Sequence, residues 1–84
     1  MPRQQSKQSK DTKFRKSLGQ WLAQQRERKN LSLRQLAALT PFSSSAIHTW
    51  ETGHQSPNLY AFVCLCEALG RNPGASLTRI LNNM

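Results

Sequence analysis

A single proline between two short amphipathic patterns constrains the fold of this chain most. In residues 32–53, apolar residues recur at helical spacing on both sides of Pro41. Proline cannot continue a helix and moves the preceding residue out of the α region, so the first helix must end by about Thr40. Ser43 then supplies an N-cap for a second helix, and Gly53 ends that helix in the left-handed conformation. The segment therefore predicts two short helices joined by a tight turn.

The outer face of the second helix is unusual. Ile47 and Trp50 lie three residues apart and are expected to face the core. The other side carries short or medium polar groups and almost no charge: Ser44, Ser45, His48, Thr49 and Thr52. A solvated helix face would normally carry Lys and Glu. Groups that donate and accept hydrogen bonds suit the major groove of DNA, where a helix fits and base edges offer both kinds of partner.

At these residues the sequence resembles the helix-turn-helix of the Cro/cI-type (XRE) repressor family. The family pattern is roughly S-Q-x-x-L-A-x-x-x-G-(hydrophobic)-S-x-x-x-I-x-x-(hydrophobic)-E-x-G. The positions that match in register are Ser32, Leu36, Ala37, Phe42, Ser43, Ile47, Trp50, Glu51 and Gly53. The likeness extends over residues 18–26 and Leu31 before the motif and over residues 57–70 after it. It implies an all-α, compact, five-helix lambda-repressor-like domain.

Two positions depart from the family pattern. Pro41 stands where the family usually has glycine, and proline cannot adopt the positive φ that glycine supplies, so we expect a remodelled turn. Leu33 stands where the family often has a glutamine that grips DNA, so that side-chain contact to a phosphate is lost. Backbone N–H groups at the start of this helix remain available to a phosphate.

The basic charge of the chain is concentrated near its N-terminus. Twelve Lys and Arg against four Asp and Glu give a net charge of +8, which favours nucleic acid first and an anionic membrane second. Residues 1–16 carry Arg3, Lys7, Lys10, Lys13, Arg15 and Lys16, whereas residues 35–84 carry only two cations. Residues 1–13 are polar and without periodicity, so we expect a flexible basic arm. This arm is either a solubilising tail or a segment that contacts DNA.

Residues 14–84 are predicted to form one helix-turn-helix domain, and apolar periodicity outside the motif predicts three further helices. They span about residues 13–29, residues 58–69, and residues 73 or 74 to 82. Asn30 is expected to end the first of them in the left-handed conformation. The predicted inner face of the fourth helix of the chain consists of Leu59, Phe62, Leu65, Cys66 and Leu69.

The last helix carries more apolar side chains than the docking of one short helix needs. These candidates for a dimer contact are Leu77, Ile80 and Leu81. Closure of the core by Leu77 and Leu81 is an equally good interpretation for those two residues. Ile80 is therefore the better interface candidate.

Docking in the manner of the family would divide the DNA contacts into two groups. Base edges would be contacted by Ser44, Ser45, His48 and Thr49. Phosphates would be contacted by Lys16, Arg34, Thr52, His54, Gln55 and Ser56. Because no Arg, Gln or Asn lies on the base-facing side, we expect specificity to need DNA shape or the basic arm as well. The resemblance also implies a partly buried ion pair between Arg26 and Glu51.

The family resemblance implies a sequence-specific, double-stranded DNA-binding transcriptional regulator. The simplest form is a repressor that binds a palindromic operator as a homodimer, encoded by a bacterium or a phage. The alternative is an antitoxin or adaptor whose main role is protein binding, with DNA binding for autoregulation.

Other function classes have little support. Two His and four acidic residues show no spacing that suggests a catalytic site, so an enzyme is not expected. No metal or cofactor is expected, since His48, His54, Cys64 and Cys66 lack ligand spacing and the two cysteines are interpreted as reduced thiols. The N-terminus lacks the apolar run of a signal peptide, and no stretch approaches the roughly 20 apolar residues of a membrane span, which indicates a cytoplasmic location.

Overall fold

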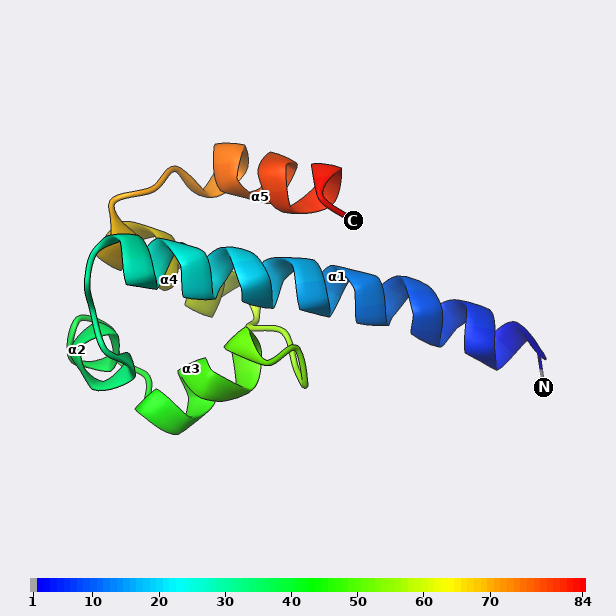
Figure 1. Cartoon of the computed structure of the whole chain (residues 1–84), viewed down its shortest axis with the longest axis horizontal. Helices are drawn as coiled ribbons and strands as arrows, with labels where there is room; N and C mark the ends of the chain where they lie inside the picture. The colour runs from blue at the N-terminus through cyan, green and yellow to red at the C-terminus, as the bar shows by residue number, and fades with distance from the viewer. Residues whose placement is uncertain (1) are drawn as a thin grey trace.

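The computed structural model describes the backbone of residues 2–84 and the side chains from residue 10 onward. This part of the chain contains five helices and no strand: α1 (Pro2–Arg28), α2 (Leu33–Ala38), α3 (Ser44–Glu51), α4 (Leu59–Leu69) and α5 (Pro73–Asn82). α1 runs through the middle of the molecule, with α2 and α3 on one side and α5 on the opposite side (Figure 1). The expected all-α, five-helix architecture is confirmed.

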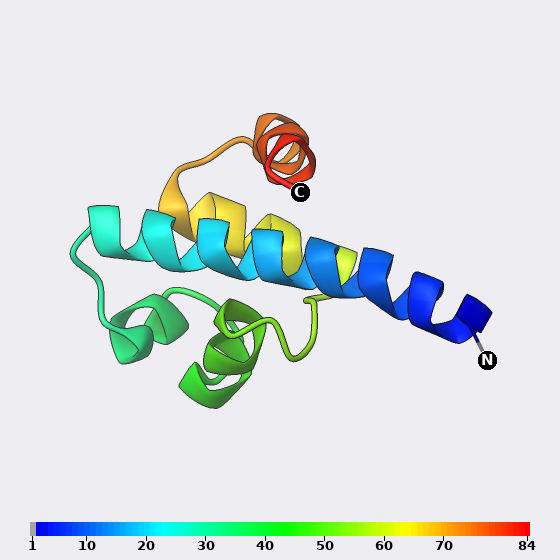
Figure 2. The same cartoon turned by 45° about the vertical axis from the view of Figure 1, so that its right-hand side comes forward.

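α1 is longer than its apolar pattern predicts. It begins at Pro2, well before the predicted start near Lys13, and its N-terminal part projects past the other helices (Figures 1 and 2). Apolar periodicity detects a helix only where one of its faces is buried. Lys, Arg and Gln have high helix propensity, so they favour a helix even where no face is buried. An ion pair between Asp11 and Arg15, one turn apart, supports this solvated segment. Met1 and the side chains of residues 1–9 lie outside the described residues, so a flexible arm over residues 1–13 stays a prediction.

The hydrophobic core contains side chains from all five helices. The largest fully buried ones are Leu22, Leu36, Ile47, Leu65, Cys66, Leu69 and Ile80. Between α1 and α4, the rings of Trp21 and Phe62 lie 5.8 Å apart. Helices as short as α2 and α3 are not stable alone, so their insertion of Leu36 and Ile47 into this core holds them in place.

The prediction for the start of α4 is wrong at one residue. Leu59 was expected to face inward, but 75% of its surface is exposed. It is the first residue of α4 and lies at the border of a buried stripe that includes Ala61 and Leu65. Asn58 caps this helix by accepting from the Ala61 N–H at 2.8 Å.

The prediction for α5 is reversed. Ile80, the preferred dimer candidate, is fully buried, whereas Leu77 and Leu81 are 36% and 51% exposed. Ser76, one turn before Ile80, is buried as well, so these two residues mark the inner face of α5. The Ser17 hydroxyl of α1 donates to the Ile80 carbonyl at 2.6 Å and holds this face of α5 against α1. Ile80 is therefore a core residue.

Both cysteines are free thiols, as interpreted from the sequence. Burial raises the pKa of the Cys66 thiol above its ordinary value, and the hydrogen bond with Ser76 opposes that rise. Among the helices that the structure describes, none is both long and apolar enough to cross a membrane.

Candidate nucleic-acid interface

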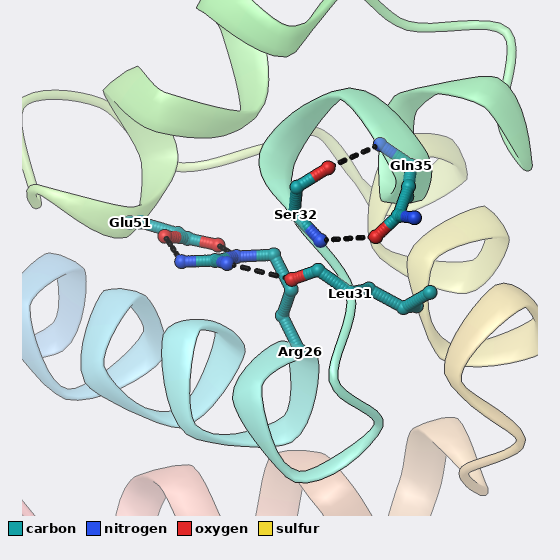
Figure 3. A network of polar contacts seen from close by, with 5 residues as sticks. All are labelled: Arg26, Leu31, Ser32, Gln35 and Glu51. Carbon is teal, nitrogen blue, oxygen red and sulfur yellow. Dashed lines mark hydrogen bonds and ion pairs between the residues drawn. The ribbon is translucent and has the colours of Figure 1, made fainter.

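A capping box sets the start of α2. The Ser32 hydroxyl accepts from the Gln35 N–H at 3.0 Å, and the Gln35 side-chain oxygen accepts from the Ser32 N–H at 2.8 Å (Figure 3). This reciprocal pair satisfies two backbone donors that a helix start otherwise leaves free. The S-x-x-Q spacing in the sequence is the signature of this capping box, which the pattern of apolar residues does not reveal. Leu33, which replaces the family's glutamine, packs against the core instead.

The turn between α2 and α3 is built without the usual glycine. Positive φ angles in the described chain occur only at Asn30, Gly53 and Gly70, so the residues around Pro41 all have negative φ. The Thr40 hydroxyl ties the turn together, because it donates to the Ala37 carbonyl at 3.1 Å and accepts from the Phe42 N–H at 3.2 Å. The Phe42 ring then packs edge-on against the Trp50 ring of α3, with centroids 5.5 Å apart.

The C-terminal end of α3 is joined to α1 by the expected pair of Arg26 and Glu51. The guanidinium donates to the two carboxylate oxygens at 2.7 and 3.0 Å, and it also donates to the Leu31 carbonyl at 2.8 Å (Figure 3). The two side chains are 15% and 8% exposed. The hydrogen bond to Glu51 raises the pKa of Arg26, so its charge is held firmly. One guanidinium thus links α1, the connection to α2 and the end of α3.

Gly19 lets α1 and α3 approach at the same place. A Cβ on this residue would lie 2.5 Å from the Glu51 carbonyl oxygen and 2.6 Å from that of Trp50. No side chain fits there unless one of the two helices moves. Sequence reasoning missed this residue; the only sign of it was an isolated glycine inside a helical pattern, which often has a packing reason.

The outer face of α3 presents the predicted base-contacting residues. Ser45 and His48 are exposed, and Ser44 and Thr49 are half-buried at its edges. The Thr49 hydroxyl donates to the Ser45 carbonyl at 3.0 Å, which leaves its oxygen lone pair and its methyl group for a partner. Ser43 caps the helix through the Ala46 N–H at 3.1 Å.

The loop after α3 lies beside the basic part of α1. Arg15 Nε donates to the Gly53 carbonyl at 3.0 Å, and a Cβ on Gly53 would be 3.4 Å from Lys16. Lys16 is exposed. The loop residues predicted to contact phosphates are exposed as well, and they are Thr52, His54, Gln55 and Ser56. The Thr52 hydroxyl donates to the Thr49 carbonyl at 3.0 Å and lies 2.8 Å from His54 Nδ1. Arg15, which the sequence analysis noted only for its charge, therefore holds this loop to α1.

Comparison with known proteins identifies the fold family. Residues 17–80 match a family described as a helix-turn-helix domain. This chain belongs to that helix-turn-helix family. It is also similar to the crystal structure of the clp gene regulator ClgR from C. glutamicum, with a TM-score of 0.77 and 27% identity over 84% of this chain and 92% of that one. No curated protein matches the chain. The XRE-type recognition made from the sequence is confirmed.

The helix-turn-helix domain gathers most of the predicted contact residues on one side of α1. α2, which carries the exposed Arg34, lies on the same side of α1 as α3 in both views (Figures 1 and 2). Leu77 and Leu81 of α5 do not join this surface, because α5 lies across α1 from α2 and α3. The polar face of α3 is thus separated from the exposed apolar side chains of α5.

Proposed function

We propose that this protein is a sequence-specific transcriptional regulator that inserts α3 into the major groove of double-stranded DNA. The observation that carries the proposal is the exposed, uncharged polar face of a helix whose other side is anchored in the core by Ile47. Ser45 and His48 are the central base contacts, flanked by Ser44 and Thr49. The similarity to a gene regulator supports the assignment. The protein acts by binding, without a catalytic step.

In this proposal the phosphate contacts flank α3 on both sides. Arg34 approaches the DNA backbone from α2, and Lys16 approaches it from α1. The loop after α3 adds the polar side chains of Thr52, His54, Gln55 and Ser56. Only two of these six side chains carry a full positive charge. The Lys and Arg residues nearer the N-terminus therefore supply much of the electrostatic attraction.

The regulator acts as a repressor and as a homodimer in this proposal. Leu77 and Leu81 are apolar side chains exposed on α5, and Leu77 lines an apolar groove of about 220 Å³. That groove is lined by Phe14, Leu18, Pro57, Leu59, Phe62 and Leu77. A two-fold dimer would place two α3 helices on one DNA face, at half-sites about 34 to 36 Å apart. The same apolar surface is what an antitoxin or adaptor would use for a different protein.

The experiment is a selection of bound fragments from fragmented genomic DNA, followed by footprinting of the enriched sites. The proposal expects a small set of sites with an inverted repeat, each bound as two copies of the chain. Enrichment of DNA without any shared sequence would contradict specific readout. Single copies on a half-site, or a stable complex with another protein, would favour the adaptor alternative.

A further inference from the structure

A basic cavity lies away from α3 and has no part in the proposed DNA contacts. It has a volume of about 260 Å³ and is lined by Trp21, Gly70, Arg71, Asn72, Ala75, Ser76 and Arg79. These residues come from α1, the α4–α5 connection and α5. Because α5 lies across α1 from α2 and α3 (Figure 2), the cavity can be occupied while DNA is bound.

The charge at this cavity is of one sign. Arg71 and Arg79 are the only cations in residues 35–84, and both line it. The Lys29 ammonium is close by, since a Cβ on Gly70 would be 3.4 Å from its Nζ. No Asp or Glu is among the lining residues, and none of the three cations is in an ion pair within the described part of the chain. Three exposed cations around one hollow repel one another unless an anion joins them.

The size and hydrogen-bonding groups of the cavity limit the ligand. A volume of about 260 Å³ exceeds the roughly 30 Å³ share of one water but falls below the range of about 300 to 1,000 Å³ for pockets that take drug-sized ligands. The two guanidinium groups offer donors in the planar arrangement that phosphate oxygens match. Asn72 uses its side-chain oxygen to accept from the Ala75 N–H at 2.9 Å, which leaves its amide N–H groups as further donors.

We infer that this cavity binds a small phosphate-bearing anion, either inorganic phosphate or a phosphate monoester. The phosphate oxygens are held by Arg71 and Arg79, with Lys29 at the rim and the indole of Trp21 forming one wall. Because Arg71 lies in the α4–α5 connection and Arg79 lies in the last turn of α5, the bound anion fastens α5 to the end of α4. Binding therefore stabilises the folded domain by mass action.

The test uses the whole chain and the two tryptophans as reporters. Inorganic phosphate is titrated at constant pH against sodium chloride of matched ionic strength, and the two indole N–H signals are followed by NMR, assigned with Trp50→Phe. Trp21 lines the cavity, whereas Trp50 of α3 packs on Phe42, which lies in the turn between α2 and α3. We expect a saturable shift of the Trp21 signal in phosphate only, with little change at Trp50. Glycerol phosphate in a second arm distinguishes a monoester site from a site for the free ion.

Matched charge variants complete the test. Arg79→Ala or Arg71→Ala should weaken phosphate binding about tenfold or more, because each removes charge-assisted hydrogen bonds. Arg28→Ala makes the same charge change at an exposed position outside the lining and should leave binding within about twofold. Equal shifts in chloride and phosphate, or equal losses in Arg28→Ala and Arg79→Ala, would overturn the site and leave only diffuse attraction. The DNA affinity of Arg79→Ala is measured as well, so that failure of the phosphate site can be told apart from failure of the proposed DNA-binding function.

Discussion

Arg26 and Glu51 join the last residue of α3 to α1 through two hydrogen bonds of 2.7 and 3.0 Å. The same guanidinium holds the Leu31 carbonyl at 2.8 Å, just before α2 begins. The pair therefore fixes both helices of the motif relative to α1. It supports the proposed DNA-binding surface, and neither member is predicted to contact DNA.

Arg26→Ala should lower the free energy of unfolding by about 3 to 5 kcal/mol, because it leaves the Glu51 carboxylate buried without a partner. Chemical denaturation measures the change, and Arg28→Ala, an exposed arginine on the same helix, is the control. Replacing both partners by apolar residues, as in Arg26→Met with Glu51→Leu, should recover a large part of the loss. A loss below about 1 kcal/mol in Arg26→Ala would mean that the pair behaves as an exposed one.

Gly19→Ala should destabilise the domain by about 1 to 3 kcal/mol, since the new methyl group meets the carbonyl oxygens of Trp50 and Glu51. Gly74→Ala is the matched control: its Cβ would meet only the Asn72 side-chain oxygen, at 3.3 Å. Replacement of glycine by alanine within a helix is expected to be neutral or to stabilise the fold by up to about 1 kcal/mol. Equal melting temperatures for the two variants would show that α1 and α3 tolerate a wider separation.

Ser45→Ala or His48→Ala should change which DNA sites are selected, with the melting temperature unchanged, because both side chains are exposed. Lys16→Ala should instead weaken binding to all sites alike and reduce the slope of log affinity against log salt by about 0.9. Competition among the selected sites at several salt concentrations measures both effects. A uniform loss of affinity in all three variants would refute the division into base contacts and phosphate contacts.

Leu81→Asp should shift a dimer toward monomer without loss of the fold, because this side chain is half exposed on α5. Ile80→Ala should lower the stability of the monomer by about 2 to 5 kcal/mol, since Ile80 is fully buried. Sedimentation across a range of protein concentrations, paired with thermal unfolding, separates the two effects. If Leu81→Asp leaves the dissociation constant unchanged, α5 is not the interface.

The Cys66 thiol should make the domain less stable as the solution becomes alkaline. Burial raises the pKa of this thiol in the folded state, so the folded chain holds a proton that the unfolded chain releases. Stability is complete below the ordinary thiol pKa of about 8.5 and falls as the pH rises above it. Thiol labelling should accordingly reach Cys64 first and Cys66 only on unfolding. Labelling of both residues at equal rates in the folded protein would contradict this order.

The sequence by itself determined the features that depend on neighbours along the chain. The caps at Ser43 and Gly53 and the left-handed Asn30 follow from local backbone preferences. Ile47 is buried as its spacing predicted, because a helix repeats its faces every few residues. The family resemblance added the pairing of Arg26 with Glu51, whose members are far apart in the chain.

Only the tertiary structure decided which of several apolar or small residues meets another helix. Ile80 is buried and Leu81 exposed because α5 presents Ser76 and Ile80 to its neighbours, a rotation that hydrophobicity alone leaves open. Gly19 matters because two carbonyl oxygens of α3 lie against it, and Arg71 and Arg79 matter together because α5 folds back beside α1. Each of these relationships joins residues from different helices or places them around a shared cavity, and periodicity within one helix carries no information about the position of the next.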